Sequence, residues 1–238
     1  MKKSTHYSQY DQDKFADIYF KRKQNGFFLD IGANDGISCS NTFFLEKERG
    51  WSGICIEPIP DVFNQLNTIR KSKNYNVCIS EKEGFVNFRR VHGAPEMLSG
   101  ILEFMTPDHI KRINEECNLT NGSYEDIKLE SRNINLILKS HGVKKIDFLS
   151  IDTEGAEFTI IKTIDFDKVH ITFLSVENND SSEEIRVYLK SKGYKYIPFI
   201  TDDFFIKDTN SLFIFKTKVF YFLAKKILKS KIKQLSGK

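Results

Sequence analysis

The sequence predicts an α/β protein built on a doubly wound, mostly parallel sheet with helices on both faces. Short apolar runs alternate with amphipathic segments between residues 26 and 193, which is typical of parallel strands joined by crossover helices. The chain has 238 residues, of which 40% are hydrophobic and 29% charged, so we expect one domain with a full core. This composition excludes a disordered chain, a collagen-like repeat and a polytopic membrane protein.

The N-terminal half predicts three buried strands separated by helices, followed by a strand with one solvent-facing side. The expected strands are 26–32, 52–58, 74–80 and 84–91, and the expected helices are 38–50 and 61–72. Gly50 is suited to end the first of these helices, and Asp61 is suited to cap the second.

The C-terminal half continues the alternation and closes with two strands. The expected helices are 134–142, 154–164 and 181–193, the expected buried strands are 145–152 and 171–178, and the closing antiparallel pair is 194–200 and 211–217. Helix 181–193 starts with Ser and Glu and ends with Gly, which favours a helix at both ends.

Residues 92–132 interrupt this pattern with mixed polarity, two prolines and a helix-like stretch near 107–117. A structureless loop of that length is uncommon inside a domain, so we expect a lid or a substrate-side insertion. Its apolar cluster has three open interpretations, namely a lid, a dimer contact or core. The cluster comprises Met97, Leu98, Ile101, Leu102, Phe104 and Met105.

The net charge of +4 combines an acidic body with a basic tail. Eight of the 36 basic residues lie in 209–238, which contains no acid, so residues 1–208 carry 28 basic and 32 acidic groups. The average charge therefore gives no support for a nucleic-acid partner. We predict that 216–238 forms a basic amphipathic helix that binds an anionic membrane surface without spanning it. Docking on the body and a disordered tail remain alternatives.

The apolar face of this helix, at about 100° per residue, contains Phe220, Leu223, Ala224, Ile227, Leu228, Ile232 and Leu235. The opposite face contains Lys225, Lys226, Lys229 and Lys233. The N-terminus lacks the apolar segment of a secretory signal. The four cysteines form no CxxC pair, so we expect Cys55 and Cys78 to be buried and the protein to be cytoplasmic.

Acidic residues mark the ends of neighbouring predicted strands. Asp30 is followed by a turn with Gly32 and Gly36, but Asn34 stands where a dinucleotide-binding turn has its second glycine, and the phosphate-loop signature is absent. Glu57 ends the next strand, where an acid can accept both hydroxyls of a ribose. A binding site with acids and few cations suits S-adenosylmethionine, which has a ribose and no phosphate, better than NAD.

Two further acids, Asp152 and Glu154, follow the strand at 145–152. They could act as a general base, hold a hard divalent metal ion, position a sugar hydroxyl or merely cap a helix. His92, at the start of the insertion, is a third candidate base. Glu157 is expected to be a solvated helix residue.

Five segments together resemble the FkbM-type methyltransferases, which use S-adenosylmethionine. They are FLDIGANDG (28–36), SNT (40–42), GICIEPIP (53–60), NVCIS (76–80) and FLSIDTEGAE (148–157). The resemblance implies a Rossmann-like class I fold with seven strands, the last antiparallel, and methyl transfer to an oxygen, often a sugar hydroxyl. It also implies that Asp152 and Glu154 face the reacting methyl group. The implied cofactor-binding residues are Asp30, Gly32, Ala33, Asn34, Asp35, Glu57, Ile79 and Ser80.

The leading hypothesis is therefore a methyltransferase domain at 1–215 that methylates a saccharide, with residues 92–132 shaping the acceptor pocket. The alternatives are a catalytically silent, membrane-associated interaction module and an NAD- or nucleotide-sugar-dependent enzyme. The acceptor, a metal requirement and the oligomeric state stay open.

Overall fold

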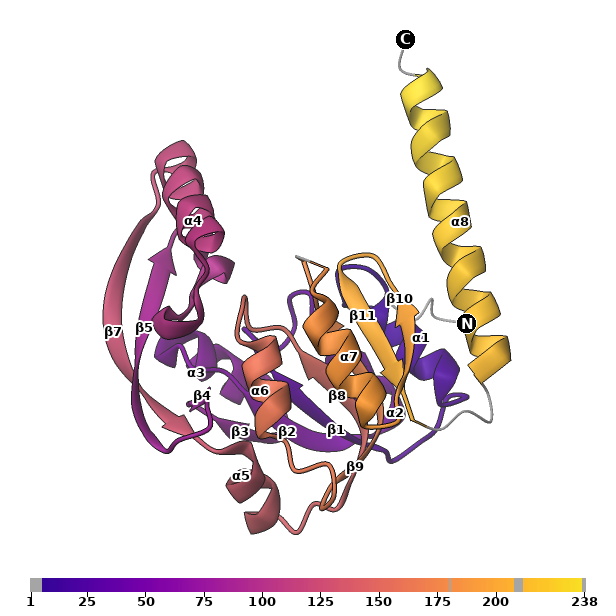
Figure 1. The fold of residues 1–238 in the computed structure, drawn as a ribbon, viewed down its shortest axis with the longest axis horizontal. Helices are drawn as coiled ribbons and strands as arrows, with labels where there is room; N and C mark the ends of the chain where they lie inside the picture. The colour runs from indigo at the N-terminus through magenta and orange to yellow at the C-terminus, as the bar shows by residue number, and fades with distance from the viewer. Residues whose placement is uncertain (1–5, 180, 208–211, 237–238) are drawn as a thin grey trace.

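A seven-stranded sheet forms the centre of the protein (Figure 1). The computed structural model describes residues 6–179, 181–207 and 212–236. The strands in spatial order are β10 (Lys195–Pro198), β11 (Asp202–Ile206), β9 (His170–Glu177), β8 (Lys145–Ile151), β1 (Phe27–Ile31), β2 (Ser52–Ile56) and β3 (Lys73–Tyr75). Neighbours are parallel except at β11, which is antiparallel to β9 and β10. The predicted doubly wound sheet with its last strand antiparallel is confirmed.

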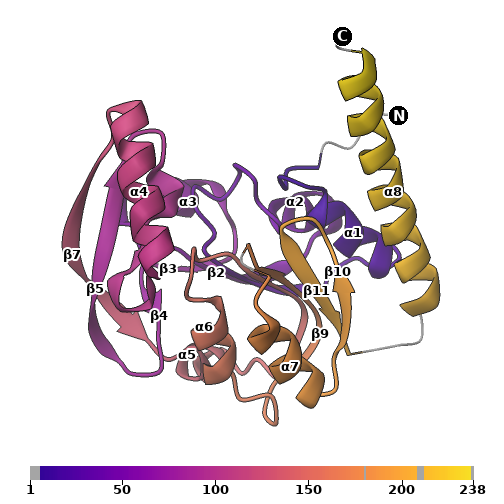
Figure 2. The same cartoon turned by 45° about the horizontal axis from the view of Figure 1, so that its top comes forward.

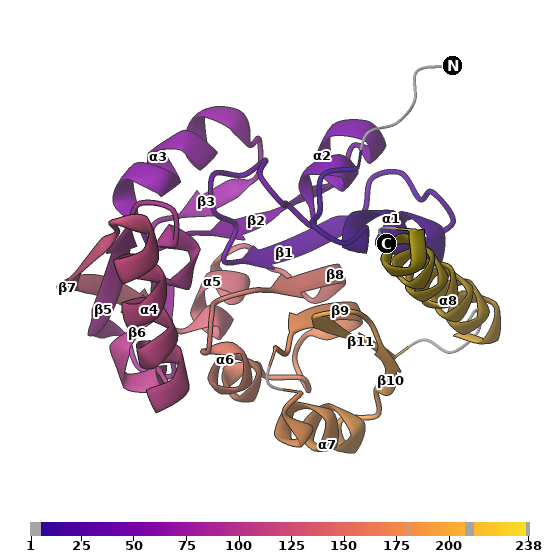
Figure 3. The ribbon, with the colours of Figure 1, turned by 90° about the horizontal axis from the view of Figure 1, so that it is seen from above.

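Helices cover both faces of this sheet (Figure 3). One face packs against α5 (Ile134–Ser140), α6 (Glu157–Thr163) and α7 (Glu183–Ser191). The other packs against α1 (Gln12–Tyr19), α2 (Phe43–Arg49), α3 (Pro60–Ile69) and the start of α8 (Leu212–Ser236). Successive side chains of a strand point to opposite faces, so Leu29 and Ile31 enter the first core and Phe28 enters the second.

A second, four-stranded sheet stands beside the first (Figure 2). It contains β4 (Cys78–Ile79), β7 (Ser123–Arg132), β5 (Gly84–His92) and β6 (Gly100–Ile101), in that order. The long antiparallel pair of β5 and β7 aligns Phe88 with Ile127. Between these strands the chain forms two short 3₁₀ turns, Glu96–Leu98 and Leu102–Phe104, and α4 (Pro107–Thr120). The insertion is therefore folded, and its strand β7 was not predicted.

Two strand assignments need correction. Residues 74–80 do not form one strand: Tyr75 ends β3 in the main sheet, and β4 begins at Cys78 in the second sheet. The closing strand is β11 rather than 211–217, which from Leu212 onward belongs to α8, while Ser211 lies outside the described residues. Strand β11 was not predicted because it begins with two acids, which are uncommon in a buried strand. Asp202 is nevertheless buried, and it accepts a hydrogen bond from Ser175.

The described part of α8 begins against the body and then extends past it (Figures 1 and 2). Phe215 and Val219 are buried in the same core as Phe15 of α1. The predicted boundary at 216 therefore falls inside the helix, while residues 237–238 lie outside the described chain. Among the described residues, no helix combines the length and the apolar character that crossing a membrane requires. Cys55 and Cys78 are buried, as predicted.

Candidate active site

A pocket lies at the carboxyl ends of β1, β2 and β8, where the order of the strands reverses. This is the position at which open α/β sheets bind ligands. Asp30, Glu57 and Asp152, one from the end of each strand, all line it. The structure therefore brings these three acids to one pocket.

The first turn of the site allows two strand ends to approach each other very closely. Gly32 has φ +85°, and a Cβ built on it would lie 1.7 Å from the backbone oxygen of Asp152. The amide of Asp152 also donates a hydrogen bond to the carbonyl of Ile31. Gly32 is thus required by the contact between the β1 turn and the β8 end, whatever it contributes to a ligand.

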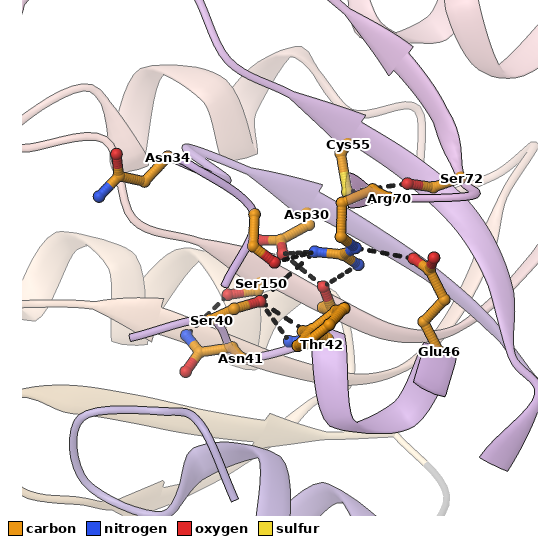
Figure 4. Close-up of polar contacts among 12 residues, drawn as sticks. Asp30, Asn34, Ser40, Asn41, Thr42, Glu46, Cys55, Arg70, Ser72 and Ser150 are labelled. Atoms are coloured by element: carbon orange, nitrogen blue, oxygen red, sulfur yellow. Dashed lines mark hydrogen bonds and ion pairs between the residues drawn. The ribbon is translucent and has the colours of Figure 1, made fainter. Parts of the chain in front are cut away.

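Asp30 has an internal partner that the sequence did not predict. Arg70, which follows α3, is buried and lies with its Nη1 atom 3.9 Å from Asp30 (Figure 4). Its Nε bonds Glu46 at 2.7 Å, and its Nη2 donates to Thr42 at 2.8 Å. Thr42 in turn donates to Asp30. Burial raises the pKa of Asp30, while Arg70 and Thr42 oppose that rise.

Glu57 is held at the pocket by the backbone. Its Oε2 accepts from the amide of Asn34 at 3.0 Å, and its Oε1 accepts from the amide of Ile59 at 2.9 Å. Burial raises the pKa of Glu57 to about 7, against the effect of these two hydrogen bonds. Each carboxylate oxygen has a second lone pair, so Glu57 can still accept two hydrogen bonds from a ligand.

Three carboxyl groups meet at the ends of β8 and β9. One oxygen each of Asp152, Glu154 and Glu177 lies within 4.8 Å of the other two. A hydrogen bond between Asp152 and Glu177 contributes to the raised pKa of Asp152 and opposes the rise in the pKa of Glu177. Burial and neighbouring carboxylates raise the pKa of Asp152, that of Glu154 to about 8 and that of Glu177 to about 7. The cluster can therefore take up or release a proton near neutral pH.

Glu157 organises the loop that presents this cluster. It is 7% exposed, so the prediction of a solvated residue was wrong. Its Oε1 accepts from the amide and hydroxyl of Thr153, both at 2.8 Å, and its Oε2 accepts from the amide of Gly155 at 3.0 Å. The loop holds Glu154 at φ 53°, which is uncommon for a residue with a side chain. Glu157 stabilises that conformation by satisfying the amides around it.

The structure brings some of the remaining candidates to the pocket and places others elsewhere. Gly32, Ala33, Asn34 and Ile79 line it. Asp35, Ser80 and His92 are not among its lining residues.

Each of these three has another contact. Asp35 accepts from the amides of Ile37 and Ser38, which orders the turn. The hydroxyl of Ser80 donates to the carbonyl of Lys82. His92 lies in the second sheet with its Nε2 atom 3.0 Å from Glu125. Nothing in this placement brings them to the three-carboxyl cluster.

The insertion also contributes residues to the pocket. Glu96, Met97, Ser99 and Ile101 line it. Leu98 instead packs into a small core with Ile113 of α4. Among the described lining residues there is no Lys, Arg or His, whereas five are acids. The pocket therefore favours neutral and cationic ligands over anions.

The structure adds residues that the sequence did not single out. Asn41, 7% exposed, lines the pocket and donates from its Nδ2 to Ser150 at 2.9 Å. Its buried Oδ1 has no hydrogen-bond partner among the described residues. Glu177, at the end of β9, was not among the predicted site residues. The sequence signal for both was their place directly after a strand or turn, which does not reveal the direction of a side chain.

Comparison with known proteins identifies the family. The model of the FkbM methyltransferase domain matches residues 30–196. The chain belongs to the FkbM methyltransferase family. The matched range includes β2, β8, the end of β1 from Asp30 and the whole second sheet, so the family assignment covers the acids described above. The family implies S-adenosylmethionine as the methyl donor.

Two solved structures match much of this chain at low sequence identity. A human methyltransferase 10 domain containing protein is 13% identical, with a TM-score of 0.41, over 82% of this chain and 79% of that one. The methyltransferase domain of METTL16 is 14% identical, with a TM-score of 0.41, over 82% of this chain and 64% of that one. A search of curated proteins finds no match.

Proposed function

We propose that this protein is an S-adenosylmethionine-dependent O-methyltransferase that methylates a hydroxyl group of a sugar. The observation that carries the proposal is the pocket at the ends of β1, β2 and β8, which is lined by acids and, among the described residues, by no cationic side chain. A sulfonium cofactor and a neutral acceptor both suit such a lining, whereas NAD and nucleotide sugars carry phosphates that it would repel.

The residues present fit this cofactor by the chemistry of their free acceptors. Glu57 retains one lone pair on each oxygen, which suits the two hydroxyls of a ribose. The unpartnered Oδ1 of Asn41 and the carboxylate of Asp30 suit an ammonium group. When bound, S-adenosylmethionine supplies a methyl group already activated for displacement. Ile79 and Ala33 add apolar surface to the same pocket.

The chain itself has to orient the acceptor and remove its proton. Asp152 and Glu154 lie at the pocket and share the carboxyl cluster with Glu177. A deprotonated carboxylate in this cluster accepts the proton of the acceptor hydroxyl, and the raised pKa values bring its basicity near neutral pH. A hydroxyl acceptor fits because it is uncharged and offers both a donor and an acceptor.

The same cluster offers oxygen ligands of the type that Mg²⁺ and Mn²⁺ use. Activity measured after chelation and after readdition of each ion separates the two roles. A base acts without the ion, whereas a metal-dependent reaction stops on chelation and resumes on readdition.

Calorimetric titration with S-adenosylmethionine and with NAD tests the cofactor. We expect heat only with the former, and no heat with it would refute the proposal. Glu57→Ala should abolish binding, while Glu83→Ala, an exposed acid outside the pocket, should leave it unchanged. Equal affinity of the two variants would remove Glu57 from the ribose site.

Incubation of labelled cofactor with glycan and lipid extracts, followed by mass spectrometry, tests the acceptor. A methylated saccharide is the expected product. Cofactor binding without transfer to any fraction would favour a catalytically silent binding module instead.

A further inference from the structure

The described part of α8 has two apolar faces, of which only one packs on the body. Phe215 and Val219 are 2% and 0% exposed. Phe213, Phe220 and Tyr221 are 84%, 51% and 71% exposed. Phe213 and Phe220 are seven residues apart, which is about two helical turns, so they lie on the same side. We call Phe213, Phe220 and Tyr221 the outer aromatic stripe.

Contacts with the body determine which face of α8 points outward. Phe215 packs edge to face against Tyr19, with ring centroids 5.2 Å apart, and against Phe173 at 5.6 Å. About two helical turns later, the ring centroid of Phe222 lies 5.1 Å from that of Phe15. These contacts occupy one side of the helix, so the outer aromatic stripe cannot turn inward without breaking them.

The charges around the stripe select an anionic partner. Lys218 and Lys225 are exposed, whereas the Nζ of Lys226 lies 4.4 Å from the ring centroid of Tyr10 on the body. The segment 209–238 carries eight lysines and no acid. Residues 1–208 carry a net charge of −4. An anionic surface therefore attracts the helix and repels the rest of the protein. The helix also extends beyond the body (Figures 1 and 2), which leaves the described outer side open to a large, flat partner.

We propose that α8 holds this protein on the surface of an anionic lipid bilayer through the outer aromatic stripe and the flanking lysines. Aromatic rings are well suited to the boundary between headgroups and acyl chains, and lysines to the phosphates above it. The helix lies along the surface, since none of the described helices can cross a bilayer. The inner face of α8 stays packed on α1, so binding requires no unfolding. This inference does not depend on the chemistry of the pocket.

Vesicle flotation of the full chain tests the proposal. We expect flotation with vesicles of phosphatidylcholine containing about 30% phosphatidylglycerol and none with pure phosphatidylcholine. Raising the salt from about 0.1 M to about 1 M should release the protein, because it screens the lysines. Binding that is equal on both kinds of vesicle, or absent from both, would overturn the proposal.

Two variants locate the surface. Phe220→Glu/Tyr221→Glu places acids on exposed positions and should lower the vesicle partition coefficient at least about tenfold. Leu119→Glu is the matched control, because Leu119 is an apolar residue of α4 that is 85% exposed, and it should bind as the wild type does. Thermal melting of both variants verifies that they are folded. Equal partition of the two would overturn the assignment.

A second copy of the chain is the competing occupant of the stripe. Sedimentation of the wild type and the Phe220→Glu/Tyr221→Glu variant distinguishes it. We expect the same mass for both. A dimer that dissociates in the variant, together with no binding to anionic vesicles, would replace the lipid surface by a protein interface.

Discussion

Replacing the buried Arg70 should strongly lower the free energy of unfolding. Its side chain is 0% exposed, and the carboxylates it faces, Asp30 and Glu46, are 5% and 8% exposed. Replacement by Met preserves much of the volume but leaves both acids without their cation. Breaking a buried ion pair on one side costs about 3–5 kcal/mol. In a domain of this length that corresponds to a fall in melting temperature of about 6–20 °C.

Thermal and denaturant unfolding of Arg70→Met measures this cost. Arg112→Met is the matched control, because Arg112 bonds Glu116 at 2.7 Å but is 52% exposed, and exposed helix pairs contribute about 0.3–0.5 kcal/mol. The double variant Arg70→Met/Glu46→Gln should lose less stability than the sum of the losses of Arg70→Met and Glu46→Gln. The reason is that the second substitution removes one of the two buried carboxylates that Arg70→Met leaves unpaired. A loss for Arg70→Met no larger than that for Arg112→Met would refute the reasoning.

Four further predictions concern the pocket. Turnover should rise with pH between about 7 and about 8, because Glu177 and Glu154 must lose their protons there to act as bases; a flat pH profile of kcat would contradict this. Folding stability, measured by denaturant titration, should fall as the pH rises from about 4.5 to about 8, since the pKa values of Glu177 and Glu154 are raised from 4.5 and the folded state holds more protons between those limits. Glu154→Gln should weaken that fall, and an unchanged slope would argue against Glu154. Glu157→Ala should reduce kcat about tenfold to hundredfold, because the loop that carries Glu154 loses its order, while calorimetry still detects cofactor binding. Loss of both turnover and cofactor binding would mean that the variant disrupts the whole pocket rather than this loop. Gly32→Ala should lower the free energy of unfolding by more than about 2 kcal/mol, because the new Cβ would lie 1.7 Å from the backbone oxygen of Asp152. Gly142→Ala is the control and should lower it by about 1–2 kcal/mol, because Gly142 has φ +64° and no neighbour within 4 Å. Similar losses for the two variants would contradict the close approach at Gly32.

The strands and the position of the pocket could be predicted because they depend on local patterns. Apolar runs of buried strands and the acids that follow them are neighbours in the chain, as Asp30 follows Leu29 and Asp152 follows Ile151. Once such strands are parallel, their carboxyl ends meet at one edge of the sheet. The order of the motifs therefore determined the fold class and brought Asp30, Glu57 and Asp152 together.

The remaining features depend on contacts between distant segments. Strand β11 was missed because its two acids look like a loop until Ser175 and Arg186 are placed beside them. Strand β7 is polar on its exposed side, and its pairing with β5 crosses a long stretch of chain. The same holds for α8, whose first turns look like a strand until Phe215 and Val219 meet the body.

The amino-acid pattern determined that this protein has a parallel sheet, an acidic pocket at its switch point and a basic tail. Only the tertiary structure decided that Arg70 lies beside Asp30, that Glu177 joins Asp152 and Glu154, and that one aromatic side of α8 stays in solvent. The physical reason is how far apart in the sequence the interacting residues are. Periodicity and strand ends are set by neighbouring residues, whereas the partner of a buried charge and the covered face of a helix depend on which distant side chains share the same space.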